Sequence, residues 1–200
     1  MVEQSDALLI EASQKEPELF GELFDRHMAE IRRYVHRRVG AKEGDDLTSD
    51  VFAAAFKARS KYDTSRHNAL PWLYGIAANL ISNHRRSEKR QAKAYARVAP
   101  ETDFDFDQSE AHSRLDAESL RPQVYEALAS LRREDRELVL LRAWADLSDR
   151  EIAEALEMPI GTVKSRLHRS LEKVKAALDL PASSDAFGGN VEPANERRSD

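Results

Sequence analysis

The sequence predicts an all-α protein of two small helical domains joined by an acidic, flexible linker. Apolar residues recur three and four positions apart in two regions, residues 18–97 and 119–179, which is the spacing of helices that bury one face. Residues 98–118 between them are acidic and have no helical period. A composition of 41% hydrophobic and 34% charged residues also suits short amphipathic helices. We expect residues 1–17 to be an N-terminal extension and residues 180–200 a disordered tail.

The overall composition limits what the protein can do. The 200 residues carry a formal net charge of -5, so nucleic-acid binding must depend on local basic patches. The absence of cysteine excludes disulfides, thiolate zinc sites and a cysteine nucleophile. The N-terminus has no basic flank before an apolar core, and no run of about 18 apolar residues occurs. We therefore expect a cytoplasmic protein.

The N-terminal region contains three predicted helices. The first runs from Glu18 to Val39 with its apolar residues on one face. A break over Gly40–Asp45 precedes the second, and Asp45 and Asp46 suit its N-terminus because acidic residues stabilise that end of a helix. The third helix has Pro71 in its first turn, where the missing N–H costs little. After His84 the apolar stripe fades, and we expect the helix to end there in a basic surface.

The C-terminal region contains a predicted helix-turn-helix from Leu147 to Val174. Ser148 and Glu151 form a Ser-x-x-Glu capping box at the start of its first helix. A tight turn that contains Gly161 follows. Thr162 is a suitable N-cap for the second helix.

The second helix of this motif has one apolar face and one polar face. The apolar residues share an arc of about 80° at ~100° per residue: Val163, Leu167, Leu171, Val174 and Leu178. The opposite face of its N-terminal half carries Lys164, Ser165, His168 and Arg169, with Arg166 on the flank. In a helix-turn-helix this half reaches base edges in the major groove. The motif therefore predicts a reader of duplex DNA, and the alternative is the solvated face of an ordinary helix pair.

The segment EIAEALEMPIGTVKSRLHRSLEKV resembles domain 4 of bacterial sigma factors, which binds the minus-35 promoter element. The C-terminal domain of two-component response regulators is similar, but the N-terminal half separates the two families. Three segments resemble sigma-factor domain 2 and have no strand pattern: ELFDRHMAEIRRYVHRRV, DDLTSDVFAAAFKA and LPWLYGIAANLISNHRRSEKR. With domains 2 and 4 over residues 18–178, the chain resembles the extracytoplasmic-function (ECF) class of the sigma-70 family.

The resemblance implies two partners, core RNA polymerase and promoter DNA. The polymerase-binding helix matches Asp46, Leu47, Asp50, Val51 and Phe52, of which Leu47, Val51 and Phe52 also suit core packing. Minus-10 contacts match Lys61, Arg66, His67 and Asn68 in a loop, Asn79 and Asn83 at base edges, and Arg85, Arg86, Lys89 and Arg90 at phosphates. Minus-35 contacts match Thr162, Lys164, Ser165, Arg166, His168 and Arg169. Asn79 also suits helix packing, and the arginine run also suits a solvated face.

The resemblance further implies an anti-sigma factor as a partner, because many members of this family have one; no residue of the sequence indicates it. No cofactor, metal or catalytic activity is expected. An EF-hand reading of the aspartates in the linker fails, because Gln108 and Arg114 stand where Gly and Glu are needed. The six histidines form no His-x-x-x-His arrangement, which argues against a nucleic-acid enzyme. A stand-alone helix-turn-helix regulator is the other alternative, and it would need no polymerase-binding surface.

The chain departs from the family pattern at three positions. Arg132 stands where Pro is common and Asp146 where Gly is common, and both positions affect loop geometry. Asn83 replaces a common Asp and bears on promoter specificity. The acidic linker resembles the segment that sigma factors thread through the polymerase cleft, although a solvated spacer explains it equally well.

Overall fold

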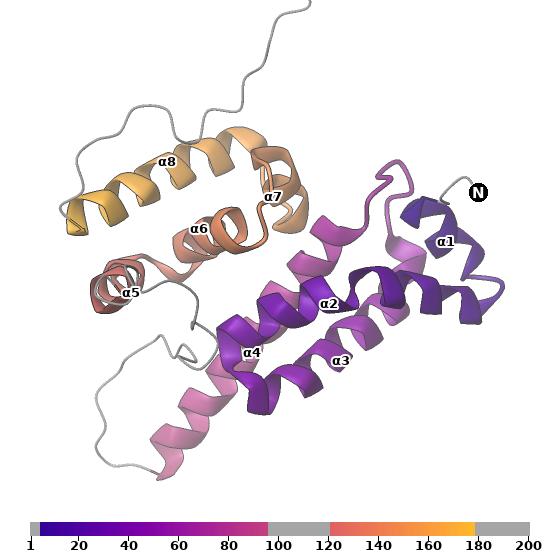
Figure 1. The fold of residues 1–200 in the computed structure, drawn as a ribbon, viewed down its shortest axis with the longest axis horizontal. Helices are drawn as coiled ribbons and strands as arrows, with labels where there is room; N and C mark the ends of the chain where they lie inside the picture. Colours follow the sequence, from indigo (N-terminus) through magenta and orange to yellow (C-terminus); the bar gives the residue numbers. More distant parts are fainter. Residues whose placement is uncertain (1–4, 96–120, 179–200) are drawn as a thin grey trace, which may run out of the picture.

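The computed structural model describes residues 5–95 and 121–178, which fold into helices with no strand among them (Figure 1). The first range, termed the N-terminal unit, holds α1 (Asp6–Ala12), α2 (Phe20–Val39), α3 (Ala41–Ala58) and α4 (Leu70–Tyr95), with 3-10 turns at Pro17–Leu19 and Arg59–Lys61. The second, the C-terminal unit, holds α5 (Arg121–Ser130), α6 (Arg133–Trp144), α7 (Asp149–Ala155) and α8 (Ile160–Ala177). The all-α class is confirmed. The predicted linker and tail lie outside the described residues, and none of the described helices is long and apolar enough to span a membrane.

Helices α2, α3 and α4 form the core of the N-terminal unit. An aromatic pair joins α2 to α4, with the rings of Tyr34 and Tyr74 edge to face and their centroids 5.0 Å apart. All three helices contribute fully buried apolar side chains, among them Leu23, Ile31, Val35, Val51, Leu73 and Ile81. The apolar stripes in the sequence thus meet in one core.

Gly40 alone separates α2 from α3. Its φ of 82° lies in a region that glycine enters at little cost. Its N–H donates to the His36 carbonyl at 2.8 Å, and its own carbonyl accepts the N–H of Gly44 at 3.0 Å. Helix α3 therefore begins directly at Ala41. The predicted break through Asp45 was wrong, and Asp45 and its neighbour Asp46 lie inside the helix instead of at its N-terminus.

The predicted N-terminal extension over residues 1–17 contains helix α1. Ile10 is fully buried, and Asp6 at the start of α1 is also buried. The Asp6 carboxylate accepts hydrogen bonds from His27 at 2.8 Å, Arg26 at 3.1 Å and the Ala69 N–H at 2.9 Å. Burial alone raises the pKa of Asp6, but these donors outweigh burial and the pKa is lowered. Asp6 therefore fastens α1 to α2 and to the loop before α4.

Two departures from the family pattern fit the backbone of the C-terminal unit. Asp146, between α6 and α7, has a φ of 52°, a left-handed conformation that glycine prefers and aspartate tolerates. Arg132, at the N-cap of α6, has a φ of -57°, close to the value that a proline ring imposes. Asp146 thus adopts a backbone conformation that suits the glycine common at its position, and Arg132 adopts one that suits the proline common at its position.

Two predicted helix ends differ from the structure. Helix α8 begins at Ile160, because the Pro159 carbonyl accepts the N–H groups of Thr162 at 2.9 Å and Val163 at 3.1 Å. Thr162 lies inside the helix, so its predicted role as the N-cap was wrong. Helix α4 continues past His84 to Tyr95. Residues 85–95 include many Arg, Lys, Glu, Gln and Ala residues, which keep a high helix propensity after the apolar stripe has faded.

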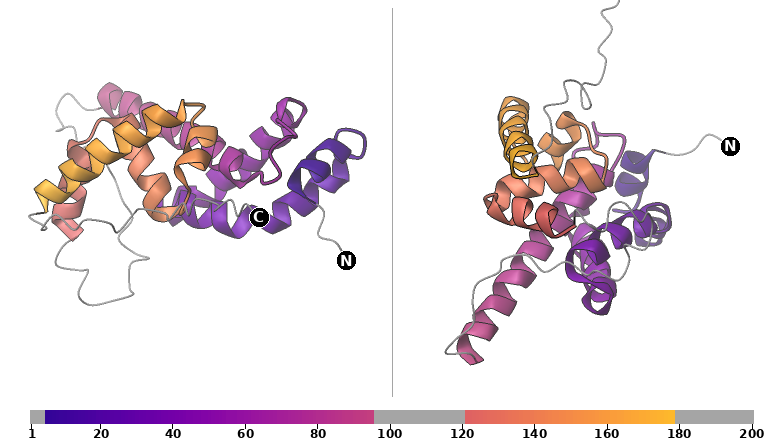
Figure 2. Two further views of the ribbon diagram at one scale, coloured as in Figure 1. Left: turned by 90° about the horizontal axis from the view of Figure 1, so that it is seen from above. Right: turned by 60° about the vertical axis from the view of Figure 1, so that its left-hand side comes forward.

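The two units pack against each other through α4 and α7 (Figures 1 and 2). Gly75 on α4 lies so close to α7 that a Cβ there would overlap the Ala155 carbonyl oxygen. A second contact joins Arg38 of α2 to Glu137 of α6, with Nη1–Oε1 at 2.6 Å and Nη2–Oε2 at 2.9 Å. The Tyr34 hydroxyl also donates to Glu137 at 2.7 Å. The interface is thus a close helix contact beside a buried, bidentate ion pair.

Burial makes this ion pair sensitive to the loss of either partner. Burial raises the pKa of Glu137 and lowers that of Arg38, but their attraction reverses both shifts, so the pKa of Glu137 is lowered and that of Arg38 is raised. Removal of one partner from a buried pair typically costs about 3–5 kcal/mol, because the other charge stays buried without compensation.

We expect Glu137→Gln to separate the two units, because it leaves the Arg38 charge buried without a counter-charge. Small-angle X-ray scattering should give this variant a larger radius of gyration than the wild type. Glu126→Gln, at an exposed position of α5, is the matched control and should stay compact. An unchanged scattering profile for Glu137→Gln would show that the ion pair does not hold the units together.

The same pair predicts sensitivity to acid. Because the pKa of Glu137 in the folded chain lies below the ordinary glutamate value of 4.5, its contribution is complete above pH 4.5 and is lost as the pH falls through the folded pKa. Scattering across a pH series should show the wild type expanding below pH 4.5. If Glu137→Gln expands over the same pH range as the wild type, another carboxylate is responsible for the acid sensitivity.

Candidate nucleic-acid interface

Helices α7 and α8 form the predicted helix-turn-helix. The capping box is confirmed: the Glu151 N–H donates to Ser148 Oγ at 3.3 Å, and the Ser148 N–H donates to Glu151 Oε2 at 2.8 Å. After α7 the chain turns at Glu157, whose φ of 51° is the left-handed conformation that often ends a helix. Gly161, expected in the turn, lies inside α8.

The two faces of α8 lie as the sequence predicts. Val163 and Leu167 are buried in the C-terminal unit, whereas Thr162 is half-buried. The polar face consists of the exposed residues Lys164, Ser165, His168 and Arg169. The Arg169 Nε donates to the Ser165 carbonyl at 3.1 Å, one turn earlier. The exposed residues form a polar strip on the first half of the helix.

Arg166, on the flank of α8, has a structural role in this fold. Its Nε donates to Asp135 at 2.7 Å and its Nη2 to Glu134 at 2.9 Å, both on α6. The bond to Asp135 contributes most to a raised Arg166 pKa, which burial only partly opposes. These bonds hold α8 to α6, so the Arg166 guanidinium is not directed to solvent as the other candidate residues are.

The loop before α4 has an ordered conformation. The Tyr62 hydroxyl lies 2.7 Å from the Arg66 carbonyl and 3.2 Å from the Asn68 carbonyl. The Tyr62 ring packs on Trp72, with centroids 4.9 Å apart. Asn68 Oδ1 accepts the backbone N–H of Leu70 at 2.9 Å, at the start of α4. The loop is therefore fixed at both ends.

This loop faces the helix-turn-helix. Of the candidate residues in it, Lys61 and His67 are exposed, while Arg66 pairs with Asp63 at 3.3 Å. The loop residues line a polar recess together with Arg150 and two glutamates of α7. The loop thus lies against α7, the first helix of the helix-turn-helix.

The candidate residues of α4 lie beside a basic cleft between the units. Asn79 and Asn83 are exposed, and Asn79 lines the cleft, which has a volume of about 520 Å³. Burial lowers the pKa of Arg85 to about 10, and the charge of Arg38 adds to this effect. Arg86 and Arg90 are exposed, and the Lys89 side chain lies outside the described atoms. The arginines that line the cleft are Arg38, Arg85, Arg86, Arg133, Arg136 and Arg166.

The candidate polymerase-binding residues of α3 divide into two groups. Leu47, Val51 and Phe52 are buried in the core, in agreement with their alternative packing role. Asp46 and Asp50 are exposed. Of these five candidates, Asp46 and Asp50 are the two that a partner can contact without unfolding α3.

Two family models match the chain, Sigma-70 region 2 over residues 23–91 and Sigma-70, region 4 over residues 121–174. The ECF RNA polymerase sigma factor SigD of Mycobacterium tuberculosis is 29% identical over 178 residues, which cover 86% of this chain and 83% of SigD. The ECF RNA polymerase sigma-E factor of Escherichia coli is 29% identical over 180 residues, covering 85% of this chain and 92% of that protein. The sigma factor RpoE of Bartonella quintana, solved with the anti-sigma factor NepR, superposes with a TM-score of 0.58 at 20% identity, covering 81% of this chain and 98% of that one.

We expect Arg166→Ala and Arg169→Ala to differ in their effect on stability. Arg166→Ala removes two charged hydrogen bonds between α6 and α8, which should cost roughly 1–2 kcal/mol. Its thermal midpoint should fall by several degrees, whereas that of Arg169→Ala should stay near the wild-type value, because Arg169 is exposed. Equal midpoints for the two variants, measured by circular dichroism, would contradict the structural role of Arg166.

Proposed function

Because the chain belongs to the sigma-70 family of RNA polymerase sigma factors, and to its ECF class, we propose that its two units bind the two elements of one promoter. The protein directs promoter-specific initiation of transcription by RNA polymerase. One observation supports the division of labour most directly. The exposed candidate DNA contacts of the first unit lie on α4 and the loop before it, and those of the second unit lie on α8.

The proposed minus-35 contacts are the exposed residues of α8. Lys164 and Arg169 donate to guanine edges in the major groove, and Ser165 bonds to any base. His168 lies on the same exposed strip. Arg166 positions α8 through its bonds to α6, so we assign it an indirect role.

The proposed minus-10 contacts belong to α4 and the loop before it. The amides of Asn79 and Asn83 both donate and accept, as unpaired base edges require. Lys61 and His67 are the exposed loop residues placed to hold a flipped base, and Arg86 and Arg90 are placed to contact phosphates.

Promoter binding, on this proposal, requires the two units to separate. In the described structure α7 covers part of α4, and the loop before α4 faces α7. We propose that the two DNA elements, which lie apart on one duplex, reach α4 and α8 together only after the units have separated. Core polymerase, bound through Asp46 and Asp50 of α3, would hold the open form.

The proposal assigns no chemistry to the protein. Its proposed role is to position DNA and polymerase, so we propose a non-catalytic initiation factor that acts in the cytoplasm. An anti-sigma factor is a further proposed partner, because a similar sigma factor was solved in complex with one. A stand-alone DNA-binding regulator is the competing proposal, and it would bind its site without polymerase.

Run-off transcription with core polymerase tests this proposal. Arg169→Ala should weaken the use of a cognate minus-35 element by about 1–3 kcal/mol and reduce discrimination against base changes there. Lys173→Ala is the matched control, because it removes a charge from the distal, exposed half of α8. It should leave discrimination unchanged.

Two results would contradict the proposal at different levels. If the wild-type chain stimulates no promoter from a genomic library, the sigma-factor function is wrong. If transcription occurs but Arg169→Ala discriminates as the wild type does, only the assignment of Arg169 is wrong.

Binding to core polymerase tests the role of α3. We expect Asp50→Asn to weaken the affinity of the labelled chain for core polymerase, because it removes an exposed charge without disturbing the core. Asp25→Asn, at an exposed position of α2, is the control. Fluorescence anisotropy gives both affinities, and equal values would exclude Asp50 from the interface.

A further inference from the structure

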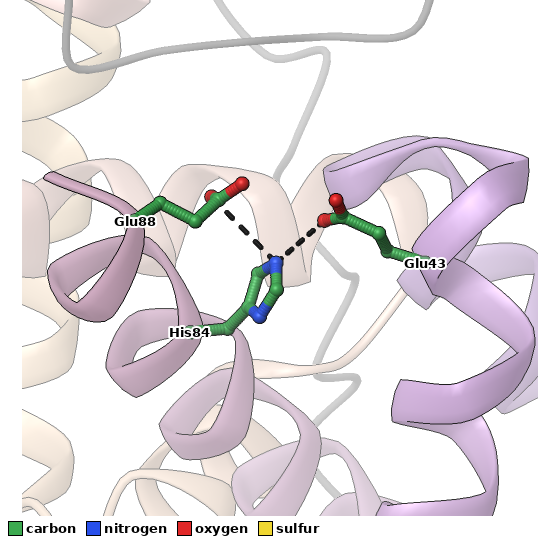
Figure 3. A group of neighbouring side chains, drawn as sticks. All are labelled: Glu43, His84 and Glu88. Atoms are coloured by element: carbon green, nitrogen blue, oxygen red, sulfur yellow. Dashed lines mark hydrogen bonds and ion pairs between the residues drawn. The ribbon is translucent and has the colours of Figure 1, made fainter. Parts of the chain in front are cut away.

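Three side chains that can bind a metal meet between α3 and α4 (Figure 3). Glu43 comes from the first turn of α3, and His84 and Glu88 lie one turn apart on α4. His84 Nε2 is 2.5 Å from Glu43 Oε2 and 3.6 Å from Glu88 Oε2. The three ligand atoms all lie within 4.8 Å of one another. Figure 3 shows both carboxylates directed toward the same ring nitrogen.

Two other histidines in the described part of the chain provide an internal comparison. His27 contacts Asp6, which also binds Arg26. His36 contacts Asp45 at 2.8 Å, and Asp45 also binds Arg32 at 2.7 Å. In both cases an arginine balances the carboxylate.

The cluster at His84 differs because a second carboxylate takes the place of the arginine. One N–H of the imidazole can serve Glu43, but the distance to Glu88 is too long for a hydrogen bond. The two glutamates bring two negative charges to one imidazole nitrogen. A divalent cation would neutralise that charge and join both carboxylates to the nitrogen.

We propose that Glu43, His84 and Glu88 bind a zinc ion. Zinc accepts a neutral imidazole nitrogen together with carboxylate oxygens, whereas Mg²⁺ and Ca²⁺ prefer oxygen ligands alone. Bonds of about 2.0–2.2 Å place the ligand atoms of a tetrahedral zinc roughly 3.3 Å apart. Both glutamates are partly or largely exposed, so they can adjust to this spacing, and water completes the coordination.

The zinc ion would fix α4 to α3 at the start of the basic segment. Arg85 and Arg86 directly follow His84, and the end of α4 extends away from the other helices of the N-terminal unit (Figure 2). A metal at this point would hold the direction of the extended helix. It would therefore stabilise the N-terminal unit as a ligand stabilises any folded state that it binds.

Calorimetric titration with Zn²⁺ tests the proposal, using the full chain without an affinity tag after treatment with EDTA. We expect one equivalent to bind and to raise the thermal midpoint, and excess Mg²⁺ should not compete. Co²⁺, as a spectroscopic substitute, should give visible absorption bands. His84→Gln and Glu88→Gln should each weaken binding about tenfold or more. His67→Gln, at an exposed position in the loop before α4, is the matched control and should keep full affinity.

Failure of the wild type to bind Zn²⁺ saturably would overturn the proposal, as would unchanged affinity in His84→Gln. Equal affinity for Mg²⁺ would overturn the choice of metal. Circular dichroism checks that each variant is folded. If His84→Gln unfolds, the Zn²⁺ affinity of Glu88→Gln tests the proposal instead, because Glu88 is exposed. Because no polymerase is present, the outcome is independent of the transcription assay.

Discussion

The buried ion pair between Arg38 and Glu137 determines how the two halves of this chain are arranged. The two residues lie 99 positions apart in sequence, and neither charge is stable in its buried position without the other. Tyr34, which lies on α2 like Arg38, donates its hydroxyl hydrogen bond to Glu137 as well. Around this contact, Gly75 allows α7 to approach α4 closely. The position of the helix-turn-helix on the N-terminal unit follows from these contacts.

An ion pair of this kind suits the opening of the interface that the proposed function requires. The cost of removing two charges from water offsets much of their attraction, so a buried pair adds little net stability. When the units separate, both charges regain water. In the closed form α7 covers part of α4 and lies opposite the loop before it, and opening would uncover that part of α4. On the proposed function, the same contact that arranges the free chain would also limit its access to promoter DNA.

The sequence predicted those features that depend on neighbouring residues. The apolar stripe of α2, the Ser148–Glu151 capping box and the polar strip of α8 are all encoded within one or two turns. Helix starts were missed where a single backbone residue decides them, as Gly40 and Pro159 do. Helix α1 was missed because it is short and depends on Asp6 reaching distant donors.

Side-chain partners from distant parts of the chain could not be predicted. Arg166 has the spacing of a DNA contact, but Asp135, on another helix, binds it. Glu43 and His84 lie 41 positions apart, so a search for metal-binding spacings within one helix does not detect the cluster. These roles become visible only when the helices are placed in three dimensions.

The distance between the two units tests this account most directly. Because the chain lacks cysteine, Glu22→Cys and Glu172→Cys would place one fluorescent dye on each unit without other labelled sites. Single-molecule energy transfer should be high in the free chain and low in the complex with core polymerase and promoter. The same high transfer in both states would contradict the requirement that the units separate before promoter recognition.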